Sequence, residues 1–226
     1  MNCEWLINRH VSHTIVNWKD SKWMKLSLIA SFWLKADYQV RPLEESDVNE
    51  DYVSWLNEPE TTRYLSTVRP GTMTIASQKE YVRKILASSN DTILGLFDSK
   101  ARLIGTSGIQ KLNTAEVGPW IGVLIGSREY RGCGMGSAFL WLVTSMLFSY
   151  FQVSRTYAGI RVLDGLFNVA SYNAFKKIGY WVDTDSERIY NPGGTGRKKV
   201  IIVSCSPDNL APPENMGITK LSVSWT

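Results

Sequence analysis

The sequence predicts a mixed β-sheet with helices on both faces, an α/β or α+β sandwich. One observation is the alternation of strand-like and helix-like segments along residues 38–205. A second is that two helical segments, about 137–150 and 168–178, each follow a strand and precede another, as crossover connections do. A third is the apolar content of 44% with 12% aromatic residues, which is ample for a core.

Length, charge and cysteine usage limit the classes of protein. At 226 residues and 25.5 kDa the chain suits one domain with appendages. The net charge of +4 is too small and too scattered to argue for nucleic acid. Three separated cysteines and two histidines argue against a disulfide framework and a structural zinc site. No apolar run approaches the length of a membrane span. We therefore expect a cytoplasmic protein that uses no metal and binds neither nucleic acid nor membrane.

The two ends of the chain are the least regular parts of the sequence. Residues 1–37 contain four tryptophans and scattered basic residues without a clean period, so we treat them as an N-terminal appendage of unassigned role. Residues 207–226 contain three prolines and read as a C-terminal extension, with a short strand at 218–225. The regular domain is expected to span residues 38–206.

The first half of this domain predicts one strand and two helices. The strand covers 38–43, and Ser46 or Asp47 is the expected N-cap of the helix that follows. That helix carries an apolar stripe through Tyr52 and ends at 57–59. After a Pro-Gly turn at 70–71, the pattern Ser77-x-x-Glu80 predicts a capping box for the second helix.

The second half predicts the centre of the sheet. Residues 93–97 and 103–109 read as a hairpin joined by a turn at 98–100, and 116–125 as a third strand. A nearly all-apolar helix covers 137–150 and must be buried on most sides. A strand at 156–162 and a helix at 168–178 follow, and Gly179 ends that helix. Residues 180–189 and 199–204 predict a closing hairpin around 191–194.

The segment Arg131-Gly132-Cys133-Gly134-Met135-Gly136 joins the third strand to the apolar helix. Glycine lets a backbone turn tightly and approach a ligand closely. The first amides of a helix lack intrahelical acceptors and point outward with the positive end of the helix dipole. Such an end binds anions, most often phosphate. A plain strand-to-helix turn is the alternative interpretation of the same glycines.

Residues 38–205 resemble the GNAT superfamily of N-acetyltransferases, and within it the RimJ/RimL-like branch. One match is the loop Arg131-x-x-Gly134-x-Gly136 after an apolar strand. Another is Asn168-x-x-Ser171 followed by Lys177-x-Gly179-Tyr180, and a weaker one runs from 41–43 to the sequence Trp-Leu-Asn-Glu-Pro at 55–59. The resemblance implies a twisted, mostly antiparallel central sheet of about six to seven strands.

The resemblance also implies acetyl-CoA as co-substrate. In that family the loop amides bind the pyrophosphate. The strand before the loop is splayed from its neighbour, so its backbone can pair with pantetheine and one amide can stabilise the oxyanion. Asn168 contacts CoA or caps its helix. The residues expected to bind the cofactor are Leu124, Ile125, Gly126, Arg131, Gly132, Cys133, Gly134, Met135, Gly136, Ser137 and Asn168.

The implied reaction is direct attack of a primary amine on the thioester, which requires a base and an acid. Glu116, at the entry to the central strand, is the candidate base, although a solvent-facing strand-end charge is the alternative. Many family members have a tyrosine as general acid where this chain has Phe175. Tyr172, Ser171 and a bound water are therefore the remaining candidates. Cys133 as a nucleophile is a minor alternative, because no histidine is near it in sequence.

The acceptor pocket is expected between residues 55–66 and 183–197, with Trp120 lining it from the sheet. The acceptor would be a small-molecule or peptide amine, such as a protein N-terminus or an amino sugar. A homodimer is common in such proteins. The alternative to an enzyme is a catalytically silent domain that binds acyl-CoA, which Phe175 favours. A phosphate-loop nucleotide enzyme is excluded, because no Gly-Lys-Ser/Thr follows the glycines.

Overall fold

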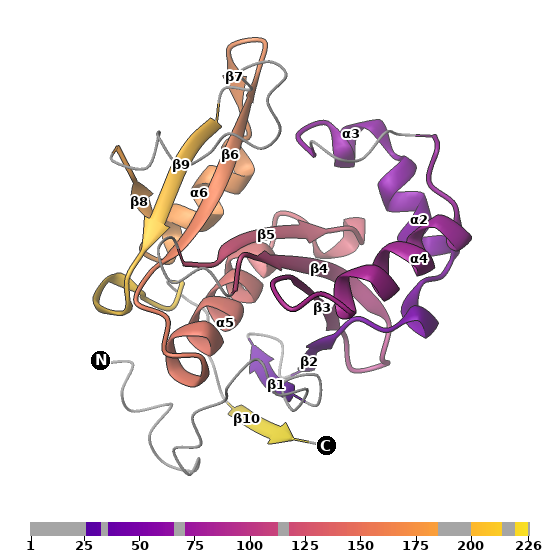
Figure 1. Cartoon of the computed structure of the whole chain (residues 1–226), viewed down its shortest axis with the longest axis horizontal. Helices are drawn as coiled ribbons and strands as arrows, with labels where there is room; N and C mark the ends of the chain where they lie inside the picture. Colours follow the sequence, from indigo (N-terminus) through magenta and orange to yellow (C-terminus); the bar gives the residue numbers. More distant parts are fainter. Residues whose placement is uncertain are drawn as a thin grey trace.

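The computed structural model describes residues 26–32, 36–65, 71–112, 118–184, 200–213 and 220–225, with side chains between 37 and 213 (Figure 1). Its strands join into one sheet in the order β10-β1-β2-β3-β4-β5-β6-β9-β8, with the short β7 paired to β6. The strands are β1 Leu26–Phe32, β2 Ala36–Pro42, β3 Thr92–Phe97, β4 Leu103–Gln110, β5 Trp120–Ile125, β6 Thr156–Leu163, β7 Leu166–Phe167, β8 Trp181–Val182, β9 Val200–Cys205 and β10 Lys220–Trp225.

The helices lie on both faces of this sheet, as predicted (Figure 1). They are η2 Glu45–Asp47, α2 Glu50–Asn57, α3 Pro59–Thr62, α4 Ile75–Leu86, η3 Arg128–Tyr130, α5 Met135–Tyr150, α6 Val169–Lys177 and η5 Pro207–Asn209. Among the described strands, every pairing is antiparallel except that of β5 with β6. The predicted mixed, mostly antiparallel sheet flanked by helices is confirmed.

The sheet is wider than the predicted six to seven strands, because both ends of the chain contribute to it. β1 pairs with β2 on one side and with β10 on the other. The strand predicted in the tail is present as β10. Residues 26–32, which form β1, belong to the segment 1–37 that was predicted as an appendage because it shows no clean period. The limits of the domain at 38 and 206 stay a prediction.

Two hydrophobic clusters fill the two faces of the sheet. In β3, Leu94 and Leu96 pack with α5 and α6, whereas Ile93 and Phe97 pack with α2 and α4. This alternation follows from the period of two along a strand. The helix α5 is buried along most of its length, from Met135 to Leu147, as its apolar composition predicted.

Two predicted helix starts were wrong. The N-cap of α2 is Asn49, whose side chain accepts a hydrogen bond from the Tyr52 amide, and not Ser46 or Asp47. Asp47 instead accepts two hydrogen bonds from Arg41, both at 2.7 Å. The capping box of α4 lies at Thr74 and Ser77, one turn before the predicted Ser-x-x-Glu. In both regions several polar residues compete for the cap, and the tertiary partners decide which one fills it.

β5 and β6 are paired only at their beginning. One pair, Trp120 with Tyr157, joins the two parallel strands, and the Tyr157 amide donates to the Pro119 carbonyl at 2.9 Å. Beyond this point no pair between them is present in the described residues, and the strands diverge (Figure 1). The predicted splay next to the glycine loop is therefore part of the fold.

Candidate functional site

The glycine loop begins α5 with an open helix N-terminus. Gly134 is the N-cap at a φ of 88°, and Gly132 has a φ of 76°, so both adopt the left-handed conformation that glycine tolerates best. The N-cap provides no side-chain cap, and the first turn contains no acidic residue. The helix begins at Met135, two residues before the predicted Ser137. Its positive end is thus left uncompensated by the chain itself.

Most main-chain amides of the loop have no acceptor among the described residues. The Arg131 amide donates to the Arg128 carbonyl at 3.1 Å, and the Ala138 amide donates to Gly134 at 3.1 Å. Between them, the amides of residues 132–137 donate to no atom of the described chain. Buried or half-buried amides normally find an acceptor. The loop therefore fits an anionic group that accepts several hydrogen bonds, such as a pyrophosphate.

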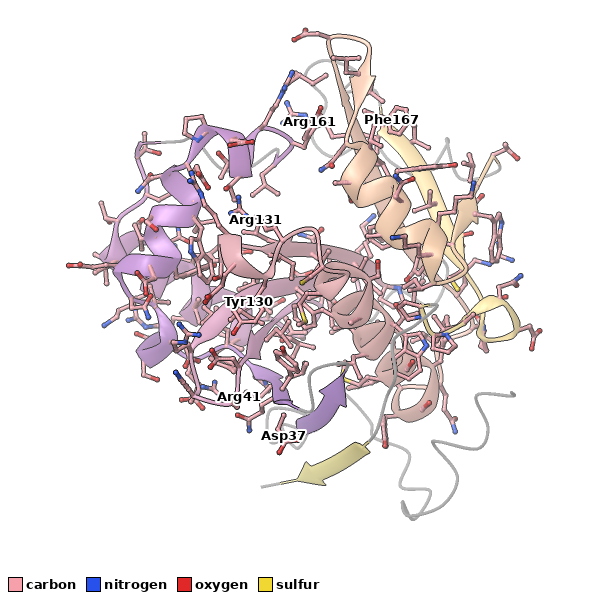
Figure 2. All side chains as sticks on the ribbon, turned by 180° about the vertical axis from the view of Figure 1, so that it is seen from behind. Asp37, Arg41, Tyr130, Arg131, Arg161 and Phe167 are labelled. Carbon is pink, nitrogen blue, oxygen red and sulfur yellow. The ribbon has the colours of Figure 1, made fainter. Side chains whose placement is uncertain are left out.

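Arg131 stabilises the end of β5. Its Nε donates to the Ile125 carbonyl at 3.0 Å, and its Nη2 donates to the Gly126 carbonyl and, at 2.9 Å, to Thr61 Oγ1 (Figure 2). The same nitrogen lies 3.4 Å from a carboxylate oxygen of Glu58. Both the amide and the guanidinium of Arg131 are thus engaged within the chain. The side chain of Arg131 therefore holds the end of β5 beside the loop.

Glu58 lies between α2 and α3, and its carboxylate connects three side chains near the end of β5. Its carboxylate accepts from Arg128, from Thr61 and from Arg131. The Arg128 guanidinium and the Thr61 hydroxyl lower the pKa of Glu58 to about 2, so it is a poor proton acceptor. No role for Glu58 was predicted from the sequence. It stands in the weak family match Trp-Leu-Asn-Glu-Pro at 55–59, which gives the residue no specific contact.

Tyr130, directly before the glycine loop, connects the start of the loop to the β3–β4 hairpin. Its hydroxyl donates to Asp98 Oδ2 at 3.1 Å, and its ring packs edge-on against Tyr38 (Figure 2). Burial would raise the pKa of Asp98, but hydrogen bonds from Arg102, Lys100 and Tyr130 outweigh it and hold the pKa below its ordinary value. Asp98 therefore stays charged and holds the loop against the sheet.

The free edge of β5 presents two residues to the splay. The amides of Gly126 and Ser127 donate to Ile104 of β4, at 3.1 and 3.2 Å. Main-chain groups alternate sides along a strand, so Val123 and Ile125 direct theirs away from β4, toward β6. Of the predicted strand residues, Leu124 and Gly126 direct their main-chain groups toward β4, and only Ile125 faces the opening. The Ile125 carbonyl already accepts from Arg131. Val123 was not predicted, because which residues face the opening depends on the register.

Gly126 is a point of close contact with α2. A Cβ at this position would lie 1.9 Å from Cε3 of Trp55, so only glycine lets that ring lie over the end of β5. A cavity of about 490 Å³ adjoins this contact, between α2, β4 and η3. Four of the five charged residues in its lining are paired, Arg128 with Glu58 and Arg102 with Glu129, and the fifth is Asp51.

The candidate acids lie on α6, beside α5. The Asn168 side chain accepts from the Ser171 amide at 3.1 Å, so it caps α6. Tyr172 is half-buried and contacts the Phe167 ring edge-on, with 5.4 Å between centroids. Phe175 is 2% exposed and packs on Tyr180, so the position of the missing tyrosine belongs to the core here.

Several predicted residues lie outside the described part of the chain or have another contact there. Glu116 lies outside it, and so do residues 185–197 of the predicted acceptor segment 183–197. Exposed Cys133 donates its thiol to the Tyr130 carbonyl at 3.1 Å. Within the described ranges, no three His, Cys, Asp or Glu side chains gather as a metal site. No described helix is long and apolar enough to cross a membrane.

Known structures share this fold. RimJ from Mycobacterium smegmatis, in complex with CoA-disulfide, matches with a TM-score of 0.62 and 16% identity, over 85% of this chain and 92% of that one. Spermidine N-acetyltransferase from Vibrio cholerae, in complex with CoA and spermine, matches with a TM-score of 0.60 and 13% identity, over 76% of this chain and 96% of that one. Ribosomal-protein-S5-alanine acetyltransferase from Vibrio fischeri matches with a TM-score of 0.56 and 17% identity, over 77% of this chain and 96% of that one.

The sequence itself was compared with curated proteins and with models of protein families. No curated protein matches the sequence. Residues 38–181 match the model of the acetyltransferase (GNAT) domain, which is more than half of the chain. The loop with free amides, the open edge of β5 and this match agree. The chain belongs to the GNAT acetyltransferase family.

Proposed function

We propose that the protein is an acetyl-CoA-dependent N-acetyltransferase that moves an acetyl group to a primary amine. The observation that carries the proposal is that the free amides at the start of α5 follow a strand, β5, whose edge is open to a partner. The amides of residues 132–137 lie at the start of α5, and the edge of β5 at Val123 and Ile125 faces the splay. An elongated ligand with a pyrophosphate and an amide-containing arm matches both the amides and the open edge.

Each part of the site has one role in this proposal. The amides of residues 132–137 bind the pyrophosphate, and Arg131 holds the end of β5 beside them. The Val123 and Ile125 main chain pairs with the pantetheine arm, and an amide there stabilises negative charge on the carbonyl oxygen. Acetyl-CoA would supply the acetyl thioester that the amine attacks.

Proton transfers complete the reaction. We assign the base to Glu116 and the acid to Tyr172, with Ser171 as the second candidate acid. Glu58 is excluded as the base by its pKa of about 2. Tyr172 is half-buried on α6, and no hydrogen bond of its hydroxyl is present among the described residues. That hydroxyl is available to protonate a leaving thiolate.

The acceptor in this proposal is a protein N-terminus, an amino sugar or another small amine. Structural neighbours named as acting on spermidine and on ribosomal protein S5 share the fold. Acceptors as different as these fit one scaffold because the acceptor is chosen by side chains above the sheet.

One observation favours a second candidate, a catalytically silent domain that binds acyl-CoA. Phe175, buried against Tyr180, replaces the tyrosine that serves as the acid in related enzymes. The test is to mix the protein with acetyl-CoA and a panel of primary amines and to follow free thiol. The enzyme releases thiol faster with at least one amine than without. Tight CoA binding with no amine-dependent release supports the silent domain.

A further inference from the structure

Three glycines lie on the face of the sheet opposite α5, two on the paired strands β4 and β5 and the third across the splay, on β6. Gly108 of β4 is paired with Gly122 of β5. The register pair Trp120 with Tyr157 places Gly159 of β6 two residues further along, level with Gly122. We call Gly108, Gly122 and Gly159 the glycine floor.

The glycine floor is open above. A Cβ added at Gly108 or Gly122 would meet no described atom within 4 Å. Gly122 and Gly159 are exposed, although they belong to central strands of a wide sheet. A central strand normally carries side chains that pack against a covering layer. The described residues therefore leave a space free above the sheet at the splay between β5 and β6.

Large side chains limit this space at both ends. At one end the rings of Trp120 and Tyr157 stack, with centroids 5.6 Å apart. At the other end Leu124 follows Gly122 on the same face and packs, like Trp55, against the hydrophobic cluster of α2, α4 and β3. The space thus runs over the strand edge that we assign to the pantetheine arm, where an acceptor amine must arrive.

Arg161, two residues beyond Gly159 on β6, supplies a positive charge toward the end of this space where Leu124 lies. It lies on the same side of β6 as Gly159, because Ala158 and Ile160 alternate with them and pack on the α5 side. Its Nη1 donates to the Leu65 carbonyl, beyond α3, at 2.9 Å (Figure 2). The guanidinium therefore lies between β6 and the end of α3.

We infer that the acceptor lies on the glycine floor and that Arg161 selects it by charge. The inference rests on the proposed function and deepens it. A second ammonium on the acceptor is repelled by the guanidinium, whereas a neutral or anionic remainder is tolerated or attracted. The acceptor class is a primary amine with a neutral or anionic remainder, and polyamines are disfavoured.

The test uses three amines of equal chain length: pentylamine, 1,5-diaminopentane and 5-aminopentanoate. The unchanged protein should show the lowest kcat/KM for the diamine. Arg161→Glu should raise the ratio of kcat/KM for the diamine to kcat/KM for the aminopentanoate by roughly tenfold or more, and Arg161→Gln should raise it by less. An unchanged ratio of the two kcat/KM values in both folded variants overturns the role of Arg161.

A second variant tests the floor. Valine suits a strand, and a Cβ at residue 122 meets no described atom within 4 Å, so the Gly122→Val protein should fold. Its branched side chain occupies the space, and KM for every accepted amine should rise at least tenfold, with an unchanged Kd for CoA. An unchanged KM overturns the inference that the acceptor binds over the glycine floor. Failure of the proposed function looks different, because the unchanged protein then releases no thiol with any amine.

Discussion

A negative charge at Gly136 tests the anion site at the start of α5. This residue is the second of the helix, and a Cβ there would lie 3.7 Å from Cγ1 of Ile125, an ordinary contact. The fold therefore has room for a small side chain at this position. Gly136→Asp places a carboxylate among the free amides of residues 132–137.

The expected loss of CoA affinity follows from Coulomb's law. A carboxylate about 5 Å from a phosphate charge costs roughly 3 kcal/mol at an effective dielectric constant near 20. Since about 1.4 kcal/mol corresponds to a tenfold change, Kd should rise roughly a hundredfold. The carboxylate also accepts hydrogen bonds from the same amides, which lowers the affinity further.

Titration calorimetry with CoA measures this change, and three variants serve as controls. Gly136→Asn has the size without the charge and should lose much less affinity. Gly136→Ala should keep the affinity and stabilise α5 by up to about 1 kcal/mol. Gly71→Asp adds the same charge in an exposed turn, where a Cβ meets no described atom within 4 Å. Gly71 has a φ of 81°, which aspartate adopts at a small cost in stability, and CoA affinity should stay unchanged. A folded Gly136→Asp protein with the original Kd would refute the anion site.

Three further variants test other parts of the account. Because the pKa of Glu58 is lowered from 4.5 to about 2, its contribution to stability is complete above 4.5 and is lost as the pH falls toward 2. The difference in urea midpoint between the unchanged protein and Glu58→Gln should shrink over that range; a constant difference would contradict the ion-pair role. Tyr172→Phe should lower kcat by roughly a hundredfold with an unchanged Kd for CoA, and a wild-type kcat would remove Tyr172 as the acid. Tyr180→Phe deletes a buried hydroxyl that bonds two threonines at 3.0 and 2.6 Å, so denaturant unfolding should show a loss of about 1–3 kcal/mol. Unchanged stability would show that this network contributes nothing.

The central fold could be predicted because its signals are local. The apolar strand at 120–125, the glycines that follow and the apolar helix are contiguous in sequence, and each residue type has one dominant physical meaning. Asn168 was predicted as a contact of CoA or a cap, and it caps α6.

The remaining features depend on contacts between distant segments. Glu58 meets Arg128 and Arg131 across about seventy residues, and no local pattern announces such a pair. The direction of the Val123 main chain depends on the register of β5 against β4. The glycine floor likewise requires the alignment of three strands. Sequence periodicity assigns residues to faces, but it does not bring strands into register.

The central claim is that acetyl-CoA accepts hydrogen bonds from the free amides of this fold. Hydrogen exchange of individual amides, measured with and without acetyl-CoA, tests it most directly. The account predicts slower exchange at residues 132–137 and at the β5 edge, Val123 and Ile125. The Arg131 amide, which already donates to Arg128, should change least within the loop. Binding of acetyl-CoA with unchanged exchange at residues 132–137 would contradict the account.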